Sequence, residues 1–346
     1  MPKLSVIIPI YNTENYLYEA LKSLQKQSFS DFEAILVDDG STDQSAEICQ
    51  MFVQNDPRFS YYHQENRGSS SARNVGFSHA IGEYVAFLDS DDTLKEDCFS
   101  HLFAAMNETP YDLVVSGIET VRGGKVLYTL VLPEQTLNGR EYQRYVLSRQ
   151  MPIFLFQSTC NKLYRRKWFL EKGVQFDEQS ISSEDSLFNT ELLVAMTPEE
   201  KVMCVSYCDY RYRWDNTNSI QRSKKTFDKV QKSIVTSMQT IAIRKKIAES
   251  FPDDTDVQKG IKQAHAIVAI CNAQLIETND FAAAERTTLY SAYLDDISYD
   301  ITDIYKEYAY TDCRILQYTM KKQPRGIHRV YKLRRLKKAL LSVLRK

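Results

Sequence analysis

Short apolar runs alternate with longer amphipathic segments over the first ninety residues of the chain. Four runs are rich in β-branched and aromatic residues and too short for buried helices, which predicts strands at Leu4–Ile10, Phe32–Val37, Phe59–His63 and Tyr84–Leu88. Between them, apolar residues recur at helical spacing, as in Glu14–Gln27. Strands that alternate with amphipathic helices predict an α/β fold with a parallel sheet covered by helices on both faces.

The pattern changes after the fourth predicted strand. Two β-rich runs flank Arg122-Gly-Gly-Lys125, which predicts a hairpin and an antiparallel extension. Further helices are predicted at 139–149, up to Lys172 and from about 182, with a strand at 202–212. From Thr226 onward helical periodicity dominates. We therefore expect an α/β domain at 1–225 and a mainly helical region at 226–346, with the boundary near 221–226.

Three carboxylates, Asp89, Asp91 and Asp92, directly follow the fourth predicted strand. Acids packed this closely repel one another. A divalent cation removes the repulsion, because hard cations prefer carboxylate oxygen. The alternative is a solvated turn in which Asp92 or Thr93 caps a helix that begins near Lys95. These residues alone leave both interpretations open.

Other polar clusters also lie where predicted strands end. The second strand runs into Asp38-Asp-Gly-Ser-Thr-Asp43, and 66–74 follows the third. Ligands of parallel sheets bind beyond the carboxyl ends of the strands, so this edge is the expected site. The first strand leads into Pro9-Ile-Tyr-Asn12, and the chain has neither a G-x-G-x-x-G loop nor a Walker motif. The phosphates of a bound nucleotide must then be neutralised by a metal or by side chains.

Composition places the chain among soluble globular proteins. Apolar residues make up 43% and charged residues 26%, and the net charge of −1 argues against nucleic acid as a partner. No run approaches the length needed to span a bilayer, and the N-terminus lacks the design of a signal peptide. The seven cysteines form no C-x-x-C pair, which predicts buried free thiols in a reducing cytoplasm.

The segment 325–346 is rich in Lys and Arg, contains no acid, and repeats apolar residues at helical spacing from Val330 to Leu344. A basic amphipathic helix of this kind can lie on an anionic membrane surface, here the inner face of the plasma membrane. The alternative is a terminal helix packed on its own domain with a solvated basic face. DNA binding is a weaker third option, since no aromatic residues interleave the charges.

Taken in order, five motifs of the first two hundred residues resemble glycosyltransferase family 2. They are Val6–Asn12, Val37–Asp43, Asn66-Arg-Gly with Ala72–Asn74, Phe87–Asp92 and Ser183–Asp185. The stretches Asn161–Arg166 and Tyr212–Ser219 resemble the non-processive bacterial members. The resemblance implies the GT-A fold, a nucleotide-sugar donor with UDP-sugar favoured, and an inverting transfer. It also implies a nucleotide-binding half at 1–115 and an acceptor half at 116–225.

The resemblance further implies roles for residues of the nucleotide-binding half. Pro9, Tyr11 and Asp39 match positions that hold the nucleobase and ribose, and Asp38 matches the neighbouring acid of that turn. Arg73 matches a basic residue near the nucleotide.

The D-x-D pair and the general base are implied in the same way. Asp91 matches the direct ligand of Mn²⁺ or Mg²⁺, Asp89 lies nearer the ribose or a metal-bound water, and Ser90 between them counts with the nucleotide-binding residues. Asp185 matches the general base, and the neighbouring Glu184 is the alternative. Candidate residues of the acceptor or donor side are Glu184, Lys162 and Arg213.

The chemistry of sugar transfer agrees with these roles. Breaking a sugar–phosphate bond leaves a diphosphate whose developing charge a metal ion stabilises as a Lewis acid. The acceptor hydroxyl has too high a pKa to attack unaided, so a carboxylate must take its proton. One displacement with one base inverts the anomeric centre.

Two departures from the family pattern narrow the prediction. Processive relatives carry Gln-x-x-Arg-Trp and membrane spans, whereas here Tyr210 stands in place of the Gln before Arg213-Trp214. We therefore expect a single-sugar transferase that acts on a lipid-linked or protein-linked saccharide. The region after Thr226 has no catalytic motif and is interpreted as an acceptor-side, membrane-docking or oligomerisation module.

Two other functions are weighed. A transferase-like module that binds nucleotide or glycan without turnover would not need the catalytic carboxylates. Nothing in the sequence favours it, since every expected carboxylate is present. A sugar nucleotidyltransferase would need a Gly-rich phosphate loop near the N-terminus, where this chain has Pro9–Asn12.

Overall fold

The computed structural model describes residues 1–180, 183–216, 225–294 and 325–332. The chain divides into two compact units, one built on residues 1–180 and 184–222 and the other on 181–183 and residues from 223 onward.

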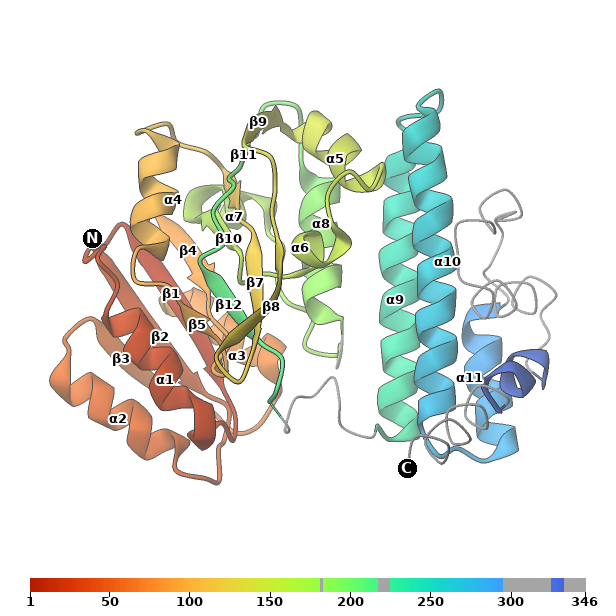
Figure 1. The fold of residues 1–346 in the computed structure, drawn as a ribbon, viewed down its shortest axis with the longest axis horizontal. Coiled ribbons are helices and arrows are strands. Elements are labelled where there is room, and N and C mark those ends of the chain that lie inside the picture. Colours follow the sequence, from red (N-terminus) through yellow and green to blue (C-terminus); the bar gives the residue numbers. More distant parts are fainter. Residues whose placement is uncertain (181–182, 217–224, 295–324, 333–346) are drawn as a thin grey trace. The chain divides into compact units, whose positions relative to one another are not determined.

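The first unit is organised around a sheet of eight strands in the order β3-β2-β1-β4-β10-β6-β11-β9 (Figure 1). The strands are β1 (Leu4–Ile10), β2 (Phe32–Asp38), β3 (Phe59–His63), β4 (Tyr84–Phe87), β6 (Leu113–Val115), β9 (Gln135–Asn138), β10 (Lys162–Arg165) and β11 (Lys201–Cys204). The four strands from β3 to β4 are mutually parallel, while β10 runs antiparallel to both β4 and β6. The predicted parallel sheet is therefore confirmed for the half that ends in the acids.

Helices cover both faces of this sheet. The helices α1 (Glu14–Gln25) and α2 (Ser45–Asn55) lie on one face, and α3 (Ser69–His79) lies on the other (Figure 1), as right-handed crossovers require. All seven residues of β1 are buried because both of its faces are covered. Gly76 of α3 packs so closely on β1 that a Cβ atom there would lie 2.4 Å from Cγ2 of Ile7.

A second sheet carries the strands β5 (Thr93–Leu94), β12 (Tyr210–Arg213), β7 (Ile118–Arg122) and β8 (Lys125–Leu130) in that order. The predicted hairpin is confirmed, with Gly123 and Gly124 at φ values of 54° and 74° in its turn. The single strand predicted at 202–212 is wrong, because β11 and β12 belong to different sheets. Between β11 and β12, the carbonyl of Tyr207 accepts a hydrogen bond from the backbone of Gly117. Gly117 directly precedes β7 of the second sheet.

The first unit has further helices beyond the four parallel strands. They are α4 (Cys98–Met106), α5 (Gly139–Leu147), α6 (Ile153–Gln157), α7 (Arg166–Lys172) and α8 (Glu184–Ala195). The alternative in which Asp92 or Thr93 caps a helix near Lys95 is wrong, because Thr93–Leu94 is strand β5 and α4 begins only at Cys98.

The second unit is helical, as predicted for the region after Thr226. Its helices are α9 (Phe227–Ala248), α10 (Thr255–Thr278) and α11 (Ala283–Leu294). Residues 325–332 are also helical, and Ile327, Val330 and Tyr331 are buried in the apolar cluster of this unit. The rest of the basic segment 325–346 lies outside the described residues. Among the described residues, we find no helix with both the length and the apolar content of a membrane span.

The prediction of buried thiols holds for Cys49, Cys98, Cys160 and Cys204. It is wrong for Cys271 of α10, which is exposed, and Cys208 is half-buried. Cys313 lies outside the described residues.

Candidate functional site

Asp38 lies at the carboxyl end of β2 and is almost completely buried. Its carboxylate accepts hydrogen bonds from the backbone of Ser41 at 2.9 Å, the hydroxyl of Tyr61 at 2.8 Å and Nδ1 of His63 at 3.1 Å. Burial raises the pKa of Asp38, but these hydrogen bonds outweigh it and hold the pKa below its usual value. Asp38 therefore anchors the turn and keeps its charge inside the protein.

Asp39 connects this turn to the loop that precedes α3. Its carboxylate accepts hydrogen bonds from Nε2 of Gln64 at 2.6 Å and from the backbone of Arg67 and Gly68, both at 2.8 Å. Because both carboxylate oxygens are held, Asp39 is fixed in one orientation at the edge of the sheet.

Pro9 and Tyr11 reach the same edge from β1. Pro9 is buried and pairs in register with Val37, whereas Tyr11 keeps 45% of its surface exposed. The next residue, Asn12, has a φ of 50° and accepts a hydrogen bond from the backbone of Thr42 at 2.8 Å. This contact ties the loop after β1 to the loop after β2 and leaves an aromatic ring exposed beside the buried acids.

Arg73 of α3 brings together acids that are far apart in the sequence. Its guanidinium lies 2.9 Å from Asp89, 3.2 Å from Asp185 and 3.6 Å from Glu184, and 5.3 Å from the centre of the Phe176 ring. The side chain is only 5% exposed. Burial lowers the pKa of Arg73, but the three carboxylates raise it above its usual value. Asp89 of the predicted D-x-D pair and Asp185, the predicted base, thus both contact the buried guanidinium of Arg73.

Asp185 lies in the first turn of α8 and exposes 27% of its side chain. Oδ2 accepts a hydrogen bond from the hydroxyl of Thr159 at 3.3 Å. Burial raises the pKa of Asp185 to about 7, although Arg73 opposes the shift, and the charge of Glu184 adds to it. A carboxylate that titrates near neutral pH and still reaches solvent is suited to accept a proton. Glu184 instead accepts a hydrogen bond from Ser69 at 3.0 Å.

The acids after β4 have different surroundings. Asp89 is 33% exposed, whereas Asp92 is buried and accepts hydrogen bonds from the hydroxyl of Tyr210 at 2.5 Å and the backbone of Arg213 at 2.7 Å. Oδ2 of Asp91 accepts a hydrogen bond from Asn216 at 2.6 Å. Asp92 therefore holds β12 against the loop, which leaves Asp89 and Asp91 as the acids that can act on a ligand.

Asp89 and Asp91 fit a hard divalent cation. Burial and the charge of Asp89 raise the pKa of Asp91, so the negative charge of this loop is not fully compensated. Within the described ranges, no three His, Cys, Asp or Glu side chains form a ready-made metal cage. Mg²⁺ is usually held by one or two carboxylates together with water and the phosphates of a substrate. The pair thus suits a cation that arrives with a phosphate-bearing ligand.

Arg213 and Lys162 occupy very different places. Nε of Arg213 donates to the carbonyl of Asp91 at 2.8 Å, and its guanidinium pairs with Glu19 at 2.5 Å, so Arg213 supports the D-x-D loop. Lys162 is 2% exposed, and its Nζ donates to the carbonyls of Leu155 at 2.7 Å and Phe156 at 3.1 Å.

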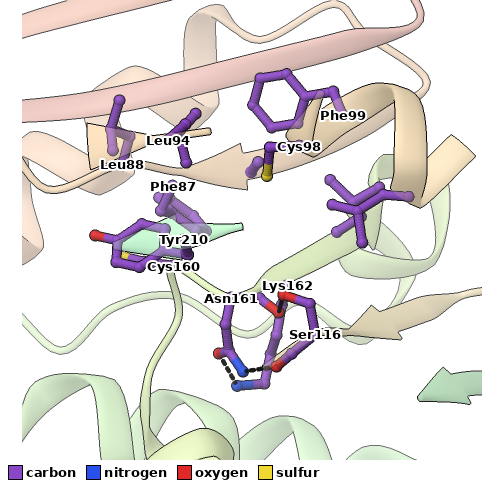
Figure 2. A pocket seen from close by; sticks show the side chains of 13 residues that line it. Phe87, Leu88, Leu94, Cys98, Phe99, Ser116, Cys160, Asn161, Lys162 and Tyr210 are labelled. Carbon is purple, nitrogen blue, oxygen red and sulfur yellow. Dashed lines mark hydrogen bonds between the residues drawn. The ribbon is translucent and has the colours of Figure 1, made fainter. Parts of the chain in front are cut away.

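The surroundings of Lys162 are those of an interior residue. Figure 2 shows it beside Asn161, whose Oδ1 lies 3.0 Å from Nζ, at a cavity of about 10 Å³ that Cys160 and Tyr210 also line. Such a volume holds at most one water molecule. Burial lowers the pKa of Lys162 to about 7. The amino group of Lys162 therefore serves as a hydrogen-bond donor to the carbonyls of α6.

We expect Lys162→Met to lower the free energy of unfolding by about 1–3 kcal/mol, because buried carbonyls lose their donor. Urea unfolding of the variant measures this loss. Lys167→Met on the exposed side of α7, where the side chain is 79% exposed, is the matched control and should change stability by no more than about 0.5 kcal/mol. Unchanged stability with lost sugar transfer would instead place Lys162 in the site.

The sequence prediction did not include several residues that shape the site. Thr159 and Gln64 hold predicted acids from neighbouring elements, and Asn216 holds Asp91 from the residues after β12. None of them lies next to the acid it contacts in the sequence. The polar run that contains Asn216 was a signal that this loop faces other polar groups, but it did not identify the partner.

Comparison with known proteins gives consistent matches. Residues 5–171 match the family model of Glycosyl transferase family 2. The chain is 46% identical to glycosyltransferase GlyG of Streptococcus pneumoniae over 188 residues, which cover 51% of this chain and 62% of that protein. It is 34% identical to the uncharacterized glycosyltransferase EpsJ of Bacillus subtilis over 225 residues, which cover 64% and 63%. The chain thus spans less than two thirds of the length of these relatives.

A solved structure with a similar fold is that of Staphylococcus aureus TarS 1–349 in complex with UDP. The match has a TM-score of 0.63 at 22% identity and covers 96% of this chain and 91% of that one. At this identity the likeness concerns the fold alone, and it confirms the expected GT-A fold. The family match covers residues 5–171, about half of the chain, and this part of the chain is therefore a glycosyl transferase family 2 domain.

Proposed function

We propose that this protein transfers one sugar from a nucleotide-sugar donor, with a UDP-sugar favoured, to a saccharide acceptor in the synthesis of a cell-surface polysaccharide or glycoconjugate. The observation that carries the proposal is the position of Arg73 between Asp89 and Asp185. The relative TarS supports the choice of donor, because it is named a β-N-acetylglucosaminyltransferase and has been solved with UDP and UDP-GlcNAc.

The nucleotide would bind at the carboxyl ends of β1 and β2. The exposed ring of Tyr11 offers a face on which a base can stack. Asp39 is buried, but among the described residues its Oδ2 accepts only the hydrogen bond from Gly68 and would accept a second one from a ribose. Pro9 is buried in β1 two residues before Tyr11, so it would act on the base through the position of that ring.

Asp91, assisted by Asp89, would hold Mn²⁺ or Mg²⁺ beside the diphosphate. When bound, the ion supplies Lewis-acid stabilisation of the leaving group. Arg73 keeps Asp89 in place through the 2.9 Å ion pair and contributes positive charge to the same region.

Asp185 would act as the general base. The acceptor oxygen bonds to the anomeric carbon while the bond from that carbon to the phosphate oxygen breaks. The hydroxyl proton passes to Asp185, and the electron pair leaves with the nucleoside diphosphate. A single displacement of this kind inverts the anomeric centre, and the hydrogen bond from Thr159 orients the base.

A panel of nucleotide sugars with Mn²⁺ tests this proposal. A donor present at about 100 times its Kd is expected to stabilise the protein by about 2.7 kcal/mol, which thermal shift detects. Release of the nucleoside diphosphate should then appear with saccharide acceptors. Binding without any release would favour the non-catalytic module, and no stabilisation by any nucleotide sugar would contradict the proposal.

A further inference from the structure

The D-x-D loop is held from the side of β12 and the residues that follow it. Tyr210 and the backbone of Arg213 donate to the two oxygens of Asp92 at 2.5 and 2.7 Å. The side chain of Asn216 donates to Oδ2 of Asp91 at 2.6 Å. These contacts join positions more than a hundred residues apart in the sequence.

Strand β4 cannot fix the acids alone. The carbonyl of Ile7 accepts from the backbone of Leu88 at 3.0 Å, and the following residues form a turn closed by a 3.0 Å hydrogen bond from Asp92 to the carbonyl of Asp89. Strand β12 is itself in register with β5 and β7. The loop therefore gains its fixed geometry from a second sheet.

Asn216 has a specific effect on Asp91. Its hydrogen bond to Oδ2 restrains the orientation of the carboxylate, together with a hydrogen bond from the backbone of Asp91 itself. Each carboxylate oxygen has two lone pairs, so the group can still bind a ligand. An outer partner of this kind orients a metal-binding carboxylate, and its loss typically costs about 10- to 100-fold in metal affinity.

We infer that Asn216 is a positioning residue that sets the affinity of the D-x-D pair for a divalent cation. The inference rests on the proposed function, because it takes Asp91 as the ligand of that cation. Tyr210 supports the same loop by holding Asp92 beneath it.

The test is the Mn²⁺ dependence of UDP binding, measured by calorimetry without any acceptor. In Asn216→Ala the half-saturating Mn²⁺ concentration is expected to rise about 10-fold or more, while UDP affinity in EDTA stays unchanged. Asn216→Gln keeps the amide donor and should recover part of the loss.

The matched control is Gln64→Ala, because Gln64 holds Asp39 through an amide–carboxylate hydrogen bond of the same length, 2.6 Å. It should weaken UDP binding without moving the Mn²⁺ titration. An unshifted titration in Asn216→Ala, with a wild type that needs Mn²⁺, overturns this inference alone. A wild type that binds UDP equally well with and without Mn²⁺ overturns both it and the metal step of the proposed function.

Discussion

Asp185→Asn is expected to lower kcat by about 10²- to 10⁴-fold, because asparagine has the same shape but cannot accept the proton of the acceptor. UDP binding and its Mn²⁺ dependence should stay intact, since Asp185 contacts Arg73 and Thr159 and the proposal assigns the metal ion to Asp91 and Asp89. Initial rates and calorimetry on the same preparations measure the two effects separately.

The pH profile of kcat/KM strengthens this test, because kcat/KM reports the ionisation of the free enzyme. Burial raises the pKa of Asp185 to about 7, so the base is protonated below that pH. The wild-type kcat/KM should fall about tenfold per pH unit on the acidic side and level off above pH 7. The residual rate of Asp185→Asn should lack this dependence. Glu184→Gln serves as the control, and a larger loss in Glu184→Gln than in Asp185→Asn would reverse the assignment of the base.

Asp91→Ala is expected to remove the Mn²⁺-dependent part of UDP affinity and to reduce transfer by at least about 10²-fold, because the leaving diphosphate loses several kcal/mol of charge stabilisation. Calorimetry with Mn²⁺ and with EDTA measures the affinity, and product release measures transfer. The variant also removes one hydrogen-bond acceptor of Asn216, while Asp92 keeps its contacts with β12.

The two variants control each other. Asp185→Asn is expected to keep the Mn²⁺ titration that Asp91→Ala loses. If Asp91→Ala bound UDP with an unchanged Mn²⁺ requirement, Asp91 would not be the ligand, and the cation would have to be held elsewhere.

The first four strands were predictable because their signal is local. In β1 and β2 a short apolar run both specifies the strand and marks where the polar residues begin. The clustering of Asp38, Asp39 and Asp89 followed from the rule that parallel strands end at one edge. The role of Asp185 came from resemblance, because nothing near it in the sequence indicates which acids it would approach.

The contacts of Asp92, Lys162 and Asn216 could not be predicted, because each depends on pairing between distant elements. Asp92 was an equally good helix cap on local grounds, and only the placement of β12 gives it Tyr210 as a partner. The contacts of Lys162 with the carbonyls of α6 likewise come from a different element of the fold. The uniform β-rich pattern of 202–212 does not indicate that the chain passes from the first sheet to the second within this stretch.

The tight contact between α3 and β1 has a genetic consequence. A methyl group at Gly76 would lie 2.4 Å from Ile7, so the helix would have to move away from the strand. Arg73 lies less than one turn earlier on α3 and would move with it, away from Asp89 and Asp185. Random mutagenesis that selects for lost transfer should therefore recover substitutions at Gly76 as well as at the acids, although glycine has no reactive group.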